Sequence, residues 1–152
     1  MSRKKRFSQN WHKQKKKIAK LHEKIKNQRQ DYIHKISIEL IRNNQVIAVE
    51  SLKVKNMIKN PKLAQSISDV SWGKFVSFLV YKAKMYSRTV IKIDQFYPSS
   101  KRCSHCDYKL DNLSLDIRHW ECPECRASHD RDINAAVSIL SEGLRLLEKE
   151  SA

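Results

Sequence analysis

Apolar positions along the chain switch between helical and strand spacing, and this switching predicts the order of its elements. A first apolar face recurs every three or four residues, at Ile18, Leu21, Ile25, Tyr32, Ile36 and Leu40. That spacing predicts a long helix over residues 10–42. Asn43 and Asn44 are expected to close it, because asparagine tolerates the left-handed conformation that ends many helices.

The apolar runs that follow predict an α/β unit. Residues 45–50 hold four consecutive apolar residues, which is typical of a strand buried on both faces, as in parallel sheets. Residues 51–69 are polar and contain Pro61, which predicts a loop. A helical face over residues 70–86 and a strand over 89–94 follow, so at least one parallel strand pair is expected. The last apolar face predicts a final helix ending near Lys149, through Ile133, Val137, Leu140, Leu144 and Leu147.

Charge adds a prediction about partners. The 152 residues carry 31 Lys or Arg against 16 acids, a net charge of +15, which favours a polyanion as partner. An anionic membrane surface is the competing interpretation, but no apolar run reaches the length of a bilayer span. We therefore expect a cytoplasmic, nucleic-acid-associated protein. The two glycines, Gly73 and Gly143, stand alone and exclude a phosphate-cradling loop or a dinucleotide-binding fingerprint.

The basic residues are densest at the N-terminus. Residues 1–30 hold twelve Lys or Arg and one acid, Glu23. Lysines at this density opposite an apolar stripe favour phosphate contact and a steep salt dependence of binding. The alternative is a basic face that is only solvated. The candidate nucleic-acid contacts are Arg3, Lys4, Lys5, Arg6, Lys13, Lys15, Lys16, Lys17 and Lys20.

All four cysteines lie in two Cys-x-x-Cys pairs separated by fifteen residues: Cys103, Cys106, Cys122 and Cys125. Two such pairs predict a tetrahedral, structural Zn2+ site closed by four thiolates. Two disulfides or free buried thiols are the alternatives, and disulfides are disfavoured inside cells. The nearby His105, His119 and His129 are assigned no metal role, because four thiolates already complete the site.

Two acidic positions are candidates for chemistry. Glu50 ends the first strand, at the sheet edge where ligands collect in open α/β folds, although a strand-end Glu is often merely exposed. The run His129-Asp130-Arg131-Asp132-Ile133-Asn134 opens the last helix. Asp130 is a plausible N-cap, and the helix dipole would stabilise Asp132 in the first turn. By itself this run indicates ordinary helix capping.

The order of these parts resembles the C-terminal half of the OrfB/TnpB transposon proteins, relatives of the miniature type V CRISPR effectors. The segments that carry the resemblance are SQNWHKQKKKIAKLHEKI, VIAVESLKV, QFYPSSKRCSHC, WECPEC and HDRDINAAVSIL. The resemblance implies an α/β, partial RNase H-like (RuvC) fold with an inserted four-cysteine zinc ribbon. It also implies RNA-guided DNA cleavage, with DNA and a guide RNA as partners. Glu50 and Asp132 would then be two acids of a magnesium triad, supported by Asp130 and Asn134.

The resemblance also sets expectations about departures. The family's first acid lies in a Gly-Ile-Asp-x-Gly-type motif that this sequence does not contain, so we expect a truncated protein that is inactive as a nuclease alone. One alternative is half of a split nuclease that a second polypeptide completes, and another is a non-enzymatic zinc-ribbon regulator that binds DNA. Asp107 and Arg126 stand where the family has Gly, so left-handed turns are expected there, with slight strain at Arg126.

The predicted division of the chain has four parts. They are a basic helical segment (1–44), a partial RuvC-like α/β segment (45–100), the zinc ribbon (101–128) and a RuvC-like helix with the last acidic motif (129–152).

Overall fold

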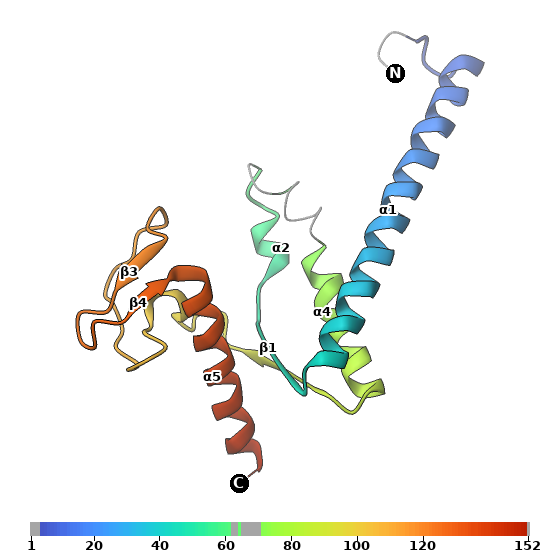
Figure 1. Ribbon diagram of the computed structural model, residues 1–152. Coiled ribbons are helices and arrows are strands. Elements are labelled where there is room, and N and C mark those ends of the chain that lie inside the picture. The colour runs from blue at the N-terminus through green and yellow to red at the C-terminus, as the bar shows by residue number, and fades with distance from the viewer. Residues whose placement is uncertain (1–3, 62–63, 65–70, 152) are drawn as a thin grey trace.

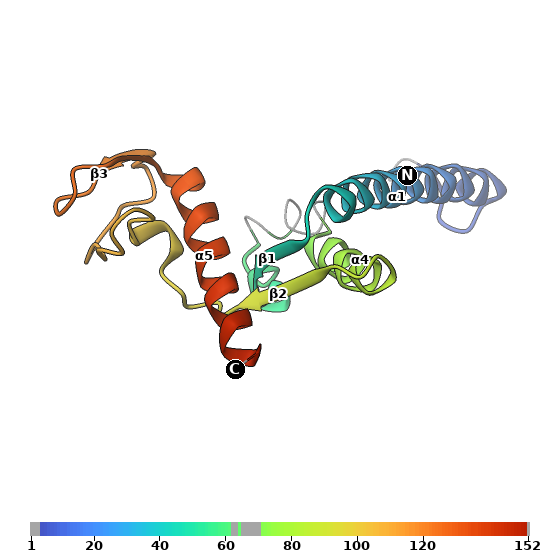
Figure 2. The same cartoon turned by 60° about the horizontal axis from the view of Figure 1, so that its bottom comes forward.

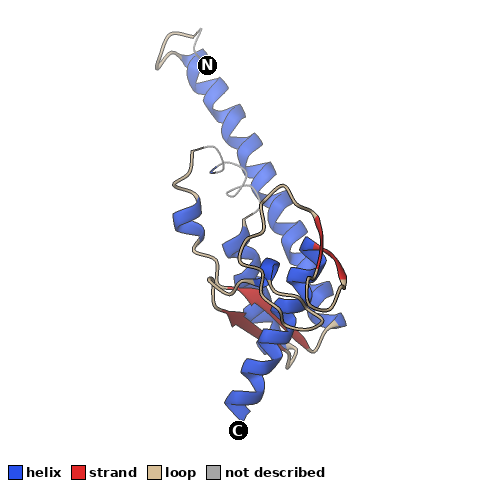
Figure 3. Ribbon diagram, turned by 90° about the vertical axis from the view of Figure 1, so that its left-hand side faces the viewer, coloured by secondary structure: helices blue, strands red, loops and turns tan. Residues whose placement is uncertain are grey.

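The computed structural model describes residues 4–61, 64 and 71–151 of the chain (Figure 1). The elements are α1 (Gln9–Asn43), β1 (Val46–Glu50), α2 (Val54–Met57), α4 (Trp72–Met85), β2 (Thr89–Ile93), the 3-10 helix η1 (Ser99–Lys101), β3 (His119–Glu121), β4 (Ser128–Asp130) and α5 (Arg131–Ser151). Helices make up most of the structure, and the strands form two small sheets (Figure 3). This order confirms the predicted succession of elements. The expected loop differs in part, because it contains α2, while residues 62–63 and 65–70 lie outside the described residues.

The centre of the molecule is a parallel pair of strands, as the sequence predicted. β1 and β2 pair in a register that runs from Val46 opposite Thr89 to Glu50 opposite Ile93. α1 and α4 lie on one side of this pair and α5 lies on the other (Figure 2). Both faces are therefore covered by helices, which explains why the residues before Glu50 are uniformly apolar.

One hydrophobic core lies between the sheet and the α1–α4 pair. Its buried residues are Ile41 of α1, Val49 of β1, and Leu79 and Ala83 of α4. Leu79 and Ala83 are four residues apart, so they share one face of α4. The apolar spacing of α4 thus has the packing role that the sequence predicted.

The buried stripe of α1 is not the predicted one. Ile33, Ser37 and Ile41 are buried, whereas Leu21 and Tyr32 of the predicted face are 58% and 65% exposed. Ser37 lies where α1 packs on α4, and its hydroxyl accepts a hydrogen bond from Lys82 of α4. Lys82 is only 6% exposed, and its Nζ donates to Ser37 Oγ at 2.7 Å and to the His34 carbonyl at 2.6 Å. Burial accordingly lowers the pKa of Lys82.

The end of α1 also differs from the prediction in its mechanism. The helix does end at Asn43, but Asn44 has φ of −132° and is extended rather than left-handed. Its side-chain amide donates to the Leu40 carbonyl at 2.9 Å, and its backbone N–H donates to the same oxygen. Asparagine therefore closes the helix by hydrogen bonding, which satisfies a carbonyl left open at the C-terminus.

The final helix packs through small and polar residues rather than through its apolar stripe. Its buried residues are Asn134, Ser138 and Gly143. Four of the five residues of the predicted stripe are exposed, by 67%, 43%, 43% and 42% for Ile133, Val137, Leu140 and Leu144, whereas Leu147 is half-buried. No helix in the described ranges is long and apolar enough to cross a bilayer.

Gly143 sets how closely α5 approaches the sheet. A Cβ placed there would lie 2.8 Å from Ala48 Cβ and 2.8 Å from Ile91 Cγ2. Glycine inside a helix costs about 1 kcal/mol relative to alanine, so this contact offsets an intrinsic penalty.

We predict that Gly143→Ala destabilises the protein, because its added methyl has no space against Ala48 and Ile91. Gly73→Ala is the matched control, since nothing lies within 4 Å of a Cβ at Gly73 in α4. Overpacking costs about 1–3 kcal/mol, so the free energies of unfolding of the two variants should differ by about that amount in urea titrations. Equal stabilities would show that α5 does not press on the sheet at Gly143.

Candidate metal centre and acidic helix start

The four cysteines meet in one cluster, as the sequence predicted. The Cys103 and Cys125 sulfurs are 3.6 Å apart, the Cys106 and Cys122 sulfurs are also 3.6 Å apart, and all four lie within 4.8 Å of one another. Sulfurs bound tetrahedrally at about 2.3 Å from zinc would be about 3.8 Å apart. A disulfide needs about 2.05 Å, so the disulfide alternative is wrong. The geometry is that of a metal site and is compatible with zinc.

Each Cys-x-x-Cys pair is folded by the same backbone hydrogen bonds. Asp107 N donates to the Cys103 carbonyl and Arg126 N donates to the Cys122 carbonyl, both at 2.9 Å. The φ angles of Asp107 and Arg126 are 65° and 60°, so both expected left-handed turns are confirmed. Asp107 is steadied there by Arg102, whose Nε donates to its carboxylate at 3.0 Å.

The cluster favours a thiolate at Cys122. Burial raises the pKa of this thiol. Hydrogen bonds from the backbone N–H groups of Cys125 and Glu124 and from the neighbouring thiols together outweigh burial, so the pKa falls to about 7. Burial and the neighbouring thiols raise the pKa of Cys106 to about 12 and also raise that of Cys125. Because the thiolate is the form that binds metal, Cys122 is the thiol readiest to bind a cation, and the cation would displace the remaining protons.

His129 contacts the cluster without being needed as a ligand. Its Nε2 lies 3.1 Å from Cys103 Sγ, and its ring lies over Trp120 with 4.6 Å between centroids. A hydrogen bond from an imidazole N–H to a metal-bound sulfur is an outer-sphere contact that orients the ligand. Sequence reasoning missed this role, because a histidine close to cysteine pairs gives the same signal whether it ligates or only supports.

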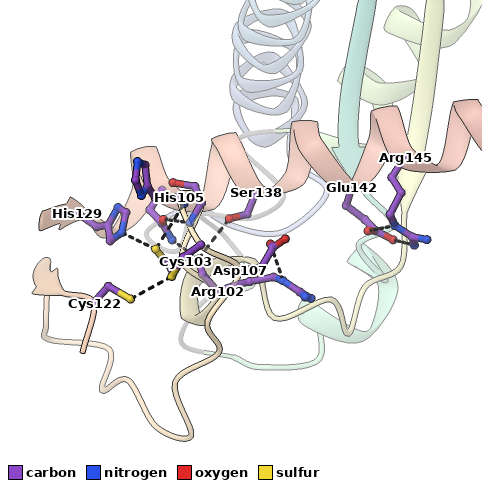
Figure 4. Close-up of polar contacts among 12 residues, drawn as sticks. Arg102, Cys103, His105, Asp107, Cys122, His129, Ser138, Glu142 and Arg145 are labelled. Atoms are coloured by element: carbon purple, nitrogen blue, oxygen red, sulfur yellow. Dashed lines mark hydrogen bonds and ion pairs between the residues drawn. The ribbon is translucent and has the colours of Figure 1, made fainter. Parts of the chain in front are cut away.

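Asn134 and Ser138 join the metal centre to α5. The Asn134 amide donates to the Arg102 carbonyl at 2.7 Å, and its oxygen accepts from Ser104 N at 2.9 Å. Ser138 Oγ donates to the same Arg102 carbonyl at 3.3 Å (Figure 4). Arg102 and Ser104 are the chain neighbours of Cys103. Asn134 is only 2% exposed, and both its amide nitrogen and its amide oxygen hydrogen-bond the backbone of the first cysteine pair.

The predicted capping role of Asp130 is confirmed. Its Oδ1 accepts from the backbone N–H groups of Asp132 and Ile133, both at 2.9 Å. The Ile133 N–H is the main cause that holds the pKa of Asp130 below its ordinary value. Asp132 itself is exposed and is paired with Arg118 of the ribbon at 3.3 Å.

Glu50 lies elsewhere, at the carboxyl end of β1. It is half-buried, and its Oε1 accepts from Ser99 Oγ of η1 at 3.0 Å. It lines a hollow of about 280 Å3 together with Trp72 and Lys92. The interpretation of Glu50 as a merely exposed strand end is therefore wrong. Glu50 and Asp132 therefore have different partners. Among the described residues, the group of three or more side chains that lie close enough to hold one metal ion is the four cysteines.

Comparison with known proteins places two stretches of the chain in families. Residues 1–61 match the OrfB_IS605 family, described as "Probable transposase". Residues 72–139 match the family described as "Cas12f1-like, TNB domain". These stretches include the basic helix and the four cysteines, respectively.

Curated relatives agree with the family models. "Putative RNA-guided DNA endonuclease" from Streptomyces pristinaespiralis is 44% identical over 95% of this chain and 36% of its own length. "Putative RNA-guided DNA endonuclease InsQ" from Escherichia coli (strain K12) is 33% identical over 97% of this chain and 40% of its own length. The chain thus spans about two fifths of the length of these relatives.

A solved structure shares the fold. The "Cryo-EM structure of the Cas12f1-sgRNA-target DNA complex" contains a chain with a TM-score of 0.64, 21% identity, and coverage of 82% of this chain and 37% of that chain. Together with the four-cysteine centre and the HDRDIN helix start, these matches show that the chain belongs to the OrfB/TnpB family.

Proposed function

We propose that this chain is a nucleic-acid-binding, zinc-containing segment of an OrfB/TnpB-type protein, and that by itself it does not cleave DNA. The observation that carries the proposal is the position of α1. Its N-terminal half extends away from the rest of the molecule (Figure 1), and the lysines from Lys13 to Lys20 are all exposed on it. A cationic rod of this kind is suited to contact with phosphates along a nucleic-acid strand.

The start of α1 adds rings to the charges. Arg6 lies 5.2 Å from the centroid of the Phe7 ring, and Lys15 lies 5.2 Å from that of Trp11. Cations beside aromatic rings are suited to backbone contact and base stacking on a single strand. Lys4, Lys5 and Arg6 are exposed, which supports their candidate role, while Arg3 lies outside the described residues.

The ligands are proposed from the relatives. The first two relatives are named for RNA-guided action on DNA, so DNA and a guide RNA are the expected partners of this chain. We propose a RuvC-like identity for residues 45–100 and 129–152, around a zinc ribbon at 101–128 and beside a basic helix at 1–44. Support comes from the parallel β1–β2 pair and from the fold shared with the Cas12f1 chain. A thiolate metal centre also fits the reducing cytoplasm.

Zinc is the proposed resident metal. Cys103, Cys106, Cys122 and Cys125 would hold it, and its role would be to fold the ribbon, since four thiolates leave no open coordination position. The sulfur separations near 3.6 Å fit a four-sulfur tetrahedron.

Glu50 and Asp132 are proposed as acids of a magnesium site that other residues must complete. Two-metal phosphodiester hydrolysis needs more oxygen ligands than two carboxylates supply. As arranged, Asp132 is paired with Arg118 and Glu50 is hydrogen-bonded to Ser99. Asp130 and Asn134 would support Asp132 indirectly, by capping α5 and by anchoring it to the first cysteine pair.

The apolar stripe of α5 favours a second candidate, in which another polypeptide completes the nuclease. Ile133, Val137, Leu140 and Leu144 form a contiguous exposed row, and such rows on soluble proteins mark interaction sites. Co-expression with the N-terminal part of a family relative tests this candidate. It requires a stable complex that gains Mg2+-dependent cleavage, and failure of the two chains to associate would eliminate it.

We predict one tightly bound zinc per chain, measured by elemental analysis and native mass spectrometry. Cys106→Ser should lose the zinc and lower the thermal midpoint, because a four-thiolate site depends on every ligand. His105→Gln is the matched control from the same cysteine pair and should keep the zinc. Loss of zinc in the histidine variant, or its retention in the cysteine variant, would contradict the assigned ligand set.

We predict nucleic-acid binding that weakens steeply with salt. Replacing Lys13, Lys16 and Lys20 together by Gln should lower the slope of log Kobs against log [NaCl] by about 0.7 for each single-strand phosphate that these lysines neutralise, measured by fluorescence anisotropy. Replacing Lys59, Lys84 and Lys109 by Gln removes equal charge away from α1 and should leave the slope close to that of the unaltered chain. Equal slopes for both triple variants would show that the lysines of α1 do not contact the phosphates of the nucleic acid.

We predict that the chain by itself does not cut DNA when Mg2+ is added. The reason is that Glu50 and Asp132 supply only two carboxylates to a reaction that needs more ligands. A nicking assay on supercoiled plasmid measures this. Robust cutting that Glu50→Ala abolishes would show that the chain holds a complete nuclease site.

A further inference from the structure

A second basic site lies where α4 meets the middle of α1, away from the lysines already proposed to contact nucleic acid. A hollow of about 320 Å3 is present there. On α1 it is lined by His22, Lys26 and Arg29, which share one face because they are spaced at i, i+4 and i+7. Lys74 of α4 lines the opposite side, so cations from two helices converge on one space.

Lys74 is held in place before any ligand binds. Its Nζ donates to Gln30 Oε1 at 2.9 Å and lies 5.9 Å from the centroid of the Phe78 ring. An ammonium group has three donors, so this bond leaves donors for a ligand. A lysine already fixed by neighbours loses less side-chain entropy on binding than a freely moving one.

The backbone adds to the positive field. α4 begins at Trp72 and runs for 14 residues, and both Ser71 and Lys74 at its start line the hollow. The start of a helix carries a partial positive charge and attracts anions. The hollow therefore combines a helix start with three side chains of fixed positive charge, and none of the described residues that line it is a carboxylate.

The floor and size of the hollow indicate what kind of anion fits. Ile25 and Ile33 of α1 line it beside the cations. A water molecule occupies about 30 Å3 of liquid, so about 320 Å3 holds more than a lone phosphate. A phosphate joined to an apolar sugar or base face uses both the charges and the isoleucines.

We propose that this hollow binds one backbone phosphate of a nucleic-acid strand, with its attached sugar lying on Ile25. The inference rests on the proposed nucleic-acid binding and adds a defined subsite to it. Lys26 and Lys74 contact the phosphate oxygens, and Gln30 positions Lys74. A strand bound here crosses from α1 to α4 instead of following α1 alone.

The test compares two double variants of the full zinc-loaded chain that lose equal charge from the same two helices. Lys26→Gln with Lys74→Gln removes the cations of the hollow. Lys35→Gln with Lys84→Gln is the control, since Lys35 is paired with Asp31 on an exposed face and Lys84 lies in the last turn of α4. Binding of labelled single-stranded RNA, single-stranded DNA and duplex DNA is measured by anisotropy over a series of NaCl concentrations.

We expect the first variant to lower the slope of log Kobs against log [NaCl] by about 0.7 for a single strand or about 0.9 for a duplex, and the control to leave it unchanged. An effect confined to RNA, or to DNA, assigns the phosphate to that strand and supports the site. The single variant Lys74→Arg should keep most of the slope of the unaltered chain, because it keeps the charge. Lys26→Gln alone, at an exposed position, serves if the double variant fails to fold.

Two results overturn the proposal and are distinguishable. If the unaltered chain binds none of the three nucleic acids, the proposed function and this site both fail. If the unaltered chain binds but the hollow and control variants have equal slopes, the site alone is wrong and Lys74 only joins α4 to Gln30.

Discussion

The structure depends on the buried face of α5, which is small and polar and therefore lets two other parts of the chain come close. At one end Asn134 and Ser138 hydrogen-bond the Arg102 carbonyl beside Cys103. Gly143 lies against the sheet, about 14 Å along the helix axis from Asn134 at about 1.5 Å per residue. A larger or apolar face would leave the Arg102 carbonyl without these donors and push the helix off Ala48. The helix thus fixes the metal centre relative to the central strands.

This constraint also gives the HDRDIN run a physical meaning apart from catalysis. Asp130 starts the helix and Asn134 fastens it, so Asp132 lies between a cap and an anchor, exposed and paired with Arg118. The run therefore has a structural role, because it starts α5 and anchors it to the first cysteine pair.

Much of this could be predicted from the sequence, for reasons that differ between elements. The cysteine cluster follows from local spacing, the left-handed turns at Asp107 and Arg126 from the resemblance to a family with Gly at both positions, and the parallel strand pair from uniformly apolar runs. The packed faces of α1 and α5 could not be predicted, because periodicity shows that a helix has an apolar face but not which neighbour covers it. Ser37 is buried through Lys82, forty-five residues away, and Asn134 through a carbonyl thirty-two residues away. Such contacts between distant polar residues leave no periodic signal.

Hydrogen–deuterium exchange of the zinc-loaded and chelated protein tests the central claim, that α5 couples the metal centre to the sheet. After zinc removal we expect faster exchange in β3, β4 and the first turns of α5 through Ser138, where Asn134 loses its ordered partners. The amides of β1, α4 and the C-terminal half of α1 should remain protected, because their core lies on the other face of the sheet. Unchanged protection at the start of α5 after zinc is removed would contradict the coupling.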